Sequence, residues 1–273
     1  MQVLEAPRQL PAEPVTGGWS VLPAWVPLPG LGALPINTFV LAGREPMLVD
    51  TGIAALGDDF IDAVARTIDL ADLRWILLSH ADPDHTGNLA RILSLAPDAQ
   101  VLTGFLAKAK LELLGMETGR FRVLGPGETI DLGDRTLHPL RPPYYDAPET
   151  LGFYDDQADV LYAVDSFGAP LPAPVPTLGD ASEAELLAGM ATWSALDAPW
   201  LASLDPAIRA RSLAAVARLD PAVVLGAHLP VAHDAALLAR LVAEACRQAL
   251  PDRLATAAVL EGIIEPLPVL RSA

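Results

Sequence analysis

The sequence feature that most constrains the fold is the segment 79–88, which reads Ser-His-Ala-Asp-Pro-Asp-His-Thr-Gly-Asn. It contains two histidines and two aspartates within six residues, and it follows the apolar run 75–78. A helical pattern begins directly after it, at Leu89. A buried strand therefore leads into a short loop that carries four metal-ligand side chains at the start of a helix. Imidazole and carboxylate groups together suit Zn, Fe or Mn.

The alternative interpretation of this loop is a solvated acidic turn with two incidental histidines. A lone His-x-Asp would favour that interpretation. Four such groups in one loop would repel one another or stay unpaired unless a cation held them. The cluster at the end of a strand therefore predicts a metal site.

Strand and helix patterns alternate along the rest of the chain. Strands are predicted at 36–41 and 46–50 as a hairpin, and then at 75–78, 100–103, 120–124, 128–132, 135–140, 150–154, 160–164 and 221–226. Helices are predicted around 60–68, after Thr86 and at 104–114. Three more are predicted around 186–193, after Asp205-Pro206 and after His233-Asp234. Residues 1–18 are predicted to be a loose lead-in, and the prolines of 19–35 predict strands that are short or at a sheet edge.

Metal-ligand side chains recur where other apolar strands end. Asp146 follows the strand at 135–140, Asp165 follows 160–164, and His228 follows 221–226. The functional loops of an α/β sandwich would converge at such strand ends. These residues are therefore expected to join the loop at 80–85.

Composition excludes several classes of protein. The formal net charge of −16 makes nucleic acid an improbable partner, because phosphate binding needs clustered Lys and Arg. No apolar run is long enough to cross a membrane, and residues 1–7 lack the pattern of a secretory signal, so a cytoplasmic location is expected. The single cysteine, Cys246, rules out an internal disulfide and a cysteine-built metal site.

The motif His80-x-Asp82-x-Asp84-His85 resembles the metal signature of the metallo-β-lactamase superfamily, whose usual form is His-x-His-x-Asp-His. A carboxylate in the place of Asp82 is similar to the flavodiiron and oxygen-binding di-iron branch. The resemblance covers residues 20–235 and implies an α/β fold, a four-layer αββα sandwich. The expected organisation is a single domain over 1–273, with a helical insertion at 171–220 between metal-ligand loops.

The resemblance also implies a ligand set. One metal would be held by His80, Asp82 and Asp146, the other by Asp84, His85 and His228, and Asp165 would bridge them. The gaps of 60, 18 and 62 residues between the four ligand segments resemble those of the di-iron branch. Asp50 and Gly52 would be structural supports that bind no metal.

Asp146 departs from the family pattern, which has a histidine at this place. Asp155, Asp156, His138 or a water molecule could fill the gap instead. The alternative is that Asp82 and Asp146 together mark a degenerate, metal-poor relative. Surface or capping roles are expected for His138 and His233.

Three histidines and four carboxylates form the expected ligand set. Four carboxylates neutralise two divalent ions, and hard oxygen ligands favour Fe over Zn, so two transition-metal ions are expected, with Fe first and Mn or Zn as alternatives. Tyr144 and Tyr145 adjoin Asp146 and could donate protons, although packing is the commoner use of such tyrosines.

The expected function is a di-iron oxidoreductase that binds or activates O₂ or NO and could oxidise a small-molecule substrate. The alternatives are a metal-dependent hydrolase of an ester, thioester or lactone, and a non-catalytic O₂ or NO sensor. No phosphate-loop pattern follows His228. The chain is therefore expected to bind no flavin and to receive electrons from an external donor. A homodimer is compatible with all three functions.

Overall fold

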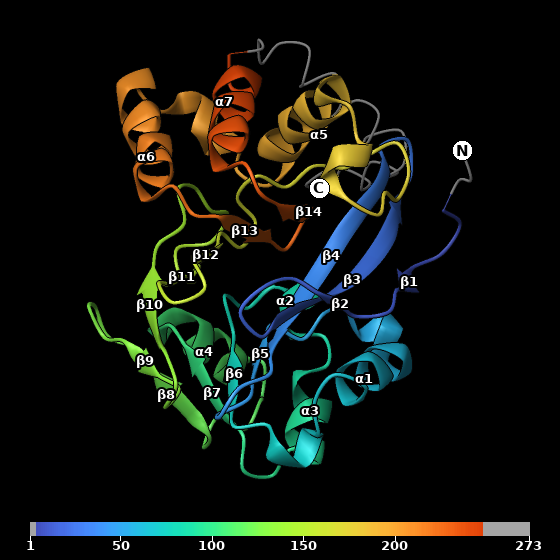
Figure 1. The fold of residues 1–273 in the computed structure, drawn as a ribbon, viewed down its shortest axis with the longest axis vertical. Coiled ribbons are helices and arrows are strands. Elements are labelled where there is room, and N and C mark those ends of the chain that lie inside the picture. The colour runs from blue at the N-terminus through green and yellow to red at the C-terminus, as the bar shows by residue number, and fades with distance from the viewer. Residues whose placement is uncertain (1–3, 248–273) are drawn as a thin grey trace, which may run out of the picture.

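The computed structural model describes residues 4–247, and residues 1–3 and 248–273 lie outside the described part. Two sheets pack face to face, with helices on their outer sides (Figure 1). This arrangement confirms the predicted α/β sandwich. The assignment of one domain to 1–273 stays a prediction, because it includes both ends that lie outside the described residues.

The first sheet has the strand order β1-β3-β4-β5-β6-β7-β8, and β2 also pairs with β3. Its strands are β1 (Arg8–Gln9), β2 (Glu13–Pro14), β3 (Trp19–Leu28), β4 (Gly32–Leu41), β5 (Met47–Val49), β6 (Trp75–Leu77), β7 (Gln100–Thr103) and β8 (Phe121–Val123). The strands β5 to β8 are parallel, so their carboxyl ends meet at one edge.

The second sheet has the order β14-β13-β12-β11-β10-β9. Its strands are β9 (Ile130–Asp131), β10 (Thr136–Leu140), β11 (Gly152–Asp155), β12 (Val160–Tyr162), β13 (Val223–Gly226) and β14 (Leu229–Ala232). Only the pair β12–β13 is parallel. The edge strand β14 was not predicted, because the sequence pattern after Gly226 indicates only a loop with a proline; Pro230 is tolerated at the edge of the sheet.

The helices are α1 (Gly57–Ala65), α2 (Pro83–Thr86), α3 (Leu89–Leu95), α4 (Phe105–Leu113), α5 (Glu183–Leu196), α6 (Pro206–Leu219) and α7 (Ala235–Ala245). Short 3₁₀ turns are η1 (Ala54–Leu56), η2 (Leu70–Asp72), η3 (Leu178–Asp180) and η4 (Pro199–Ser203). In Figure 1, α5, α6 and α7 lie together at the top, and α1 and α3 lie at the bottom. Among residues 4–247, no helix has the length and hydrophobicity that a membrane crossing requires.

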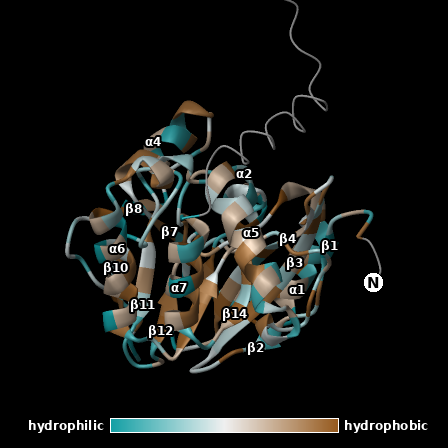
Figure 2. Ribbon diagram, turned by 90° about the horizontal axis from the view of Figure 1, so that it is seen from above, coloured by the Kyte–Doolittle hydropathy of each residue, from teal (hydrophilic) through white to brown (hydrophobic). Residues whose placement is uncertain are grey.

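Three hydrophobic clusters explain the four layers. Residues on one side of each central strand fill the space between the sheets, as Phe39 and Leu77 do. Their neighbours Val40 and Ile76 point the other way and pack under α1 and α3. This alternation with a period of two makes the strands apolar on both faces. A third cluster joins the outer face of the second sheet to α5, α6 and α7. Figure 2 shows hydrophobic residues concentrated in the strands, with helices of mixed character around them.

The expectation of only short or edge strands in residues 19–35 is wrong. Strands β3 and β4 are ten residues long and pair along their whole length, from Trp19 opposite Leu41 to Leu28 opposite Gly32. Pro35 is tolerated because its nitrogen faces away from β3. The amides of Ala33 and Asn37, two residues before and after it, donate hydrogen bonds to the carbonyls of Leu171 and Ala227, which lie outside β3. A missing N–H on this outer edge breaks no bond of the β3–β4 ladder.

The lead-in is more ordered than the sequence predicted. The two-residue strands β1 and β2 pair with β3 and hold residues 8–14 against the first sheet. The helical insertion predicted at 171–220 contains α5 and α6, and these helices pack on the second sheet together with α7.

Candidate metal centre

The loops that follow β6, β10, β12 and β13 meet at one end of the sandwich. They bring together the seven residues of the expected ligand set, which are His80, Asp82, Asp84, His85, Asp146, Asp165 and His228. Three of the loops follow strands of the second sheet, and the fourth follows β6 of the first sheet. Residues up to 148 positions apart in the chain therefore contact one another because two sheets pack face to face.

The hydrogen bonds of the histidines turn the same nitrogen of each ring toward the cluster. The Nδ1–H of His85 donates to Asp50 Oδ2 at 2.9 Å, and that of His228 donates to the Pro35 carbonyl at 3.0 Å. Ser79 Oγ donates to Asp50, so it accepts from His80 Nδ1 at 3.0 Å. Each Nε2 is then free to donate its lone pair to a metal ion, and the partners of Nδ1 fix the ring orientation.

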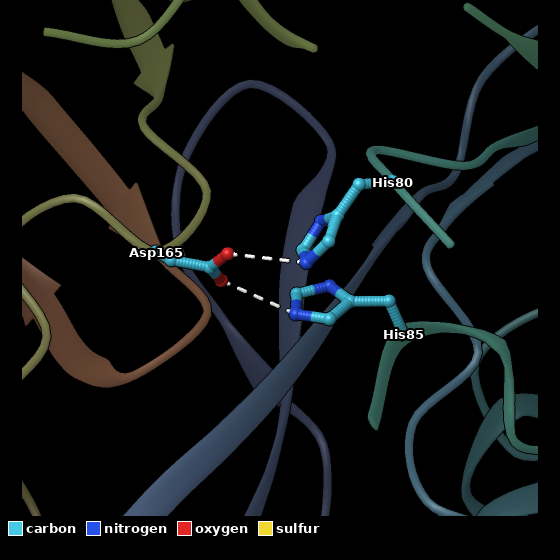
Figure 3. Close-up of side chains that lie close together, drawn as sticks. All are labelled: His80, His85 and Asp165. Carbon is cyan, nitrogen blue, oxygen red and sulfur yellow. Dashed lines mark ion pairs between the residues drawn. The ribbon is translucent and has the colours of Figure 1, made fainter. Parts of the chain in front are cut away.

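Asp165 lies between the histidines with both of its oxygens engaged. Its Oδ2 is 3.2 Å from His80 Nε2, and its Oδ1 is 3.2 Å from His85 Nε2 and 3.1 Å from His228 Nε2. Figure 3 shows the two oxygens directed toward His80 and His85. Only 2% of the Asp165 surface is exposed. Within residues 4–247, neither Asp165 Oδ1 nor His85 Nε2 makes a well-aligned hydrogen bond, although the two atoms lie 3.2 Å apart. Buried polar atoms in this state require a cation or another partner.

The cluster contains two groups that could each hold an ion. Asp84, His85 and His228 form one group, with Asp84 Oδ2 at 3.3 Å from His228 Nε2 and 3.5 Å from His85 Nε2. His80, Asp82 and Asp146 form the other. Ligand atoms held about 2.1 Å from one ion lie roughly 3 Å apart when they occupy neighbouring positions at right angles. The separations in the first group therefore fit a transition-metal ion.

Electrostatic interactions in the cluster shift several pKa values. Burial opposes charge on Asp165, but His85 and His80 outweigh it and hold the pKa of Asp165 well below its usual value. Burial likewise opposes charge on His85, but Asp84, Asp165 and Asp50 raise its pKa well above normal. The pKa of Asp82 is raised by burial and by Asp146, against the opposing effect of His80. The carboxylates thus attract positive charge strongly.

Asp50 and Gly52 lie behind the ligand loop. Asp50 accepts hydrogen bonds from the Ser79 N–H and hydroxyl, from His85 Nδ1 and from the Tyr162 hydroxyl, so it supports the loop without facing the cluster. Gly52 has a φ of +58° and its carbonyl accepts from the Gly87 N–H at 2.9 Å. A side chain at Gly87 would collide with the backbone of Ile53 and Ala54, so the two glycines allow this close approach.

The residues that could have replaced Asp146 as a ligand lie away from the cluster. Asp155 is buried and accepts from Trp19 Nε1 at 2.9 Å and from Arg135 at 3.0 Å, so it stabilises the packing of the two sheets. His138 pairs with Asp156 on the exposed side of β10 and β11. Among the described residues it is Asp146 that joins the cluster, with Oδ2 at 3.9 Å from His80 Nε2.

The two tyrosines next to Asp146 occupy different environments. Tyr144 is fully buried in the cluster under α5 to α7, and its hydroxyl accepts a hydrogen bond from the Phe167 N–H. Burial raises the pKa of Tyr144 far above its ordinary value. The Tyr145 ring packs against Trp200 at 5.6 Å and under Arg141 at 4.8 Å. These contacts favour the packing role over the proton-donor role.

Two residues at the cluster were missed by sequence reasoning, and both come from the end of α5. Trp193 donates its indole N–H to the Asp165 carbonyl at 3.0 Å, and its ring lies 4.5 Å from that of His228. Asp197 directs a carboxylate oxygen toward Asp146 and Asp165, and the three oxygens lie within 4.8 Å of one another. Burial and the nearby Asp165 raise the pKa of Asp197 to about 8. The search for ligands at strand ends could not find residues on a helix.

The packed sheets, the outer helices and the histidine–aspartate cluster at the strand ends define a protein of the metallo-β-lactamase class. Residues 35–225 match the model of the family described as ODP family beta lactamase, and the chain belongs to this family. The predicted membership in the metallo-β-lactamase superfamily, on its flavodiiron branch, is confirmed.

The chain is similar to several flavodiiron-type proteins. It is 30% identical over 133 residues to the putative diflavin flavoprotein A 2 of Nostoc sp., covering 48% of this chain and 23% of that protein. It is 28% identical over 136 residues to the anaerobic nitric oxide reductase flavorubredoxin of Salmonella typhi, covering 48% of this chain and 28% of that protein. The matched segment thus spans about a quarter of the length of these relatives.

Solved structures share the fold over most of the chain. The rubredoxin oxygen:oxidoreductase of Desulfovibrio gigas superposes with a TM-score of 0.73 at 18% identity, over 87% of this chain and 62% of that chain. A fragment (1–254) of the putative diflavin flavoprotein A 5 of Nostoc sp. gives a TM-score of 0.73 at 19% identity, over 89% and 98% of the two chains.

Proposed function

We propose that this chain holds two transition-metal ions, with iron preferred over manganese or zinc, and that the site reduces or activates O₂ or NO. The observation that carries the proposal is the position of Asp165, whose two oxygens face different histidines. A carboxylate in that position suits a bridge between two ions. The relatives support the chemistry, because one is named a nitric oxide reductase and another a rubredoxin oxygen:oxidoreductase.

The donor set supports iron over zinc. The ligand set that the motif implies contains three histidines and four carboxylates. Hard oxygen ligands favour Fe or Mn. Two bound iron ions would supply one-electron redox chemistry to a diatomic substrate. The residues of the chain would position those ions: Asp50 and the Pro35 carbonyl orient His85 and His228, and Asp165 would hold both ions together.

The surroundings of the cluster would limit access by water. The Trp193 ring covers His228, and His80, His85 and His228 are each at most 2% exposed. Asp82, Asp84 and Asp146 are only partly buried, so they line the side from which a small substrate would enter.

The test is metal loading followed by substrate consumption. Protein produced with iron available should contain close to two Fe per chain by elemental analysis, and with a chemical reductant it should consume O₂ or NO. The His85→Ala variant should lose this activity, whereas His138→Ala, which replaces an exposed histidine away from the cluster, should keep it.

Three outcomes would contradict the proposal. Stoichiometric zinc that iron cannot displace, together with cleavage of an ester, thioester or lactone, would indicate the hydrolase. Reversible binding of O₂ or NO without turnover in the presence of reductant would indicate a sensor. Wild-type protein without bound metal would indicate a metal-poor relative.

We also propose that a separate redox centre supplies the electrons. The names of the relatives mention flavin and rubredoxin groups, which are one- or two-electron carriers. Reduced flavin or rubredoxin should therefore sustain O₂ or NO consumption by the iron-loaded protein, and failure of both donors would contradict this assignment. Oxidation of a small-molecule substrate, a homodimer and a cytoplasmic location stay predictions.

A further inference from the structure

Asp197 reaches the candidate metal centre from a part of the chain that the family motif does not include. It follows the last turn of α5, where its N–H donates to the Trp193 carbonyl at 2.8 Å. The Trp193 indole N–H itself donates a hydrogen bond to the Asp165 carbonyl. The end of α5 is therefore attached to the Asp165 loop, and this attachment directs the Asp197 carboxylate toward Asp146 and Asp165.

Two of the three carboxylates have a buried oxygen without a hydrogen-bond partner among the described residues. In the part of the chain that the structure describes, the buried atoms Asp197 Oδ2 and Asp165 Oδ1 have no well-aligned hydrogen bond. Within residues 4–247, none of Asp146, Asp165 and Asp197 forms an ion pair with a lysine or arginine. Three carboxyl groups with oxygens within 4.8 Å of one another, of which Asp165 is buried and the other two are partly buried, can all be ionised together only when a cation neutralises them.

We propose that Asp197 is an additional metal ligand, which with Asp146 and Asp165 makes the His80–Asp82 side of the cluster an oxygen-rich subsite. The proposal rests on the dinuclear site proposed above. Asp146 stands where the family pattern expects a histidine. The carboxylate of Asp197 supplies a further donor on that same side, from a helix instead of a strand end.

The two subsites then differ in chemical character. The oxygen-rich subsite has one imidazole, from His80, and four carboxylates, whereas the opposite subsite has two imidazoles, from His85 and His228. Carboxylates suit Mn²⁺, and imidazoles suit Fe, Zn and related ions. The oxygen-rich subsite should therefore accept a hard divalent ion such as Mn²⁺ or Fe²⁺ and discriminate against zinc.

The experiment is a titration of metal-free protein with Mn²⁺ alone, in which free Mn²⁺ is measured by electron paramagnetic resonance. Wild-type protein should bind two ions. Asp197→Asn, which keeps the shape and removes the charge, should bind one of the two at least roughly tenfold more weakly. The matched control is Asp205→Asn, which removes a charge at the exposed N-terminal cap of α6. Because asparagine caps a helix as well as aspartate does, this control should bind like wild type.

Two further measurements keep the result interpretable. Circular dichroism should show that metal-free Asp197→Asn is folded at least as stably as wild type, because asparagine keeps the shape of the side chain and removes a carboxyl group that lies beside two others. Asp146→Asn combined with Asp197→Asn should be non-additive in Mn²⁺ affinity, because both residues serve one ion.

The proposal is overturned if Asp197→Asn binds the same number of Mn²⁺ ions as wild type with the same affinity. That result would leave the dinuclear proposal intact. If wild-type protein binds only one ion, and Asp197→Asn abolishes its binding, then Asp197 is a ligand and the dinuclear proposal fails. The two failures are therefore distinguishable in one titration.

Discussion

At the scale of single residues, the distinction between a shared and an unshared ligand matters most. Asp165 faces His80 through one oxygen and His85 and His228 through the other, while Asp146 approaches only His80 among the histidines. A residue that would serve two ions and a residue that would serve one can be separated by substitution.

Asp165→Ala should therefore lose most of both metal ions, whereas Asp146→Ala should chiefly weaken one. The reason is that the remaining carboxylates cannot replace an oxygen placed between the two groups of ligands. Elemental analysis after iron loading measures the effect. Asp156→Ala is the control because Asp156 is exposed and, among residues 4–247, forms an ion pair only with His138. Unchanged metal content in Asp146→Ala would remove Asp146 from the ligand set.

At the scale of elements, the packing of α5 decides where Trp193 and Asp197 lie. Gly189 lies in the middle of α5, and a side chain there would come within 2.5 Å of the Pro170 carbonyl and 2.9 Å of the Ala169 Cβ. The helix can therefore approach the loop after Asp165 only because residue 189 has no side chain. This close approach places the end of α5 beside the candidate metal centre.

Gly189→Ala should destabilise the protein although it improves helix propensity. Alanine in a helix interior gains about 0.5–1 kcal/mol over glycine. Overpacking costs about 1–3 kcal/mol, so the net loss is expected to reach about 1–2 kcal/mol, and metal affinity should fall as Trp193 shifts. Urea unfolding measures the change. Gly119→Ala is the control, since a side chain at that position contacts nothing within 4 Å. Equal stability of the two variants would show that α5 packs less tightly than the structure indicates.

At the scale of the whole molecule, stability and metal binding should be linked. The chain carries a net charge of −16, and eight acidic or imidazole side chains converge on one end of the sandwich. An ion that binds this cluster in the folded state and not in the unfolded chain stabilises the fold by mass action.

Removal of metal by a chelator should therefore lower the melting temperature. A free ion concentration of 100 times Kd stabilises a protein by about 2.7 kcal/mol, which corresponds to a shift of roughly 5–10 °C for a chain of this size. Differential scanning calorimetry with and without chelator checks this value. The Asp165→Ala variant should show a much smaller shift, and an equal shift in both proteins would mean that the ions bind elsewhere.

The sequence by itself determined the features that depend on neighbours in the chain. The apolar run before Ser79, the dense loop from His80 to His85 and the polar residues after three later strands predicted a metal site at strand ends. The resemblance of the motif to the metallo-β-lactamase superfamily then implied the sandwich and the seven ligands. These patterns are readable because strand burial and ligand chemistry act on consecutive residues. The family comparison confirms the fold, and the ligand assignments stay predictions.

Only the tertiary structure decided the features that depend on which elements pack together. The prolines of β3 and β4 predicted short strands, yet the outward direction of the Ala33 and Asn37 amides lets both strands run for ten residues. Asp197 has no motif around it, and it meets Asp146 and Asp165 because Gly189 lets α5 approach the loop after Asp165 closely. Contacts between distant segments depend on shape and packing distance, and no local pattern of residues records these quantities.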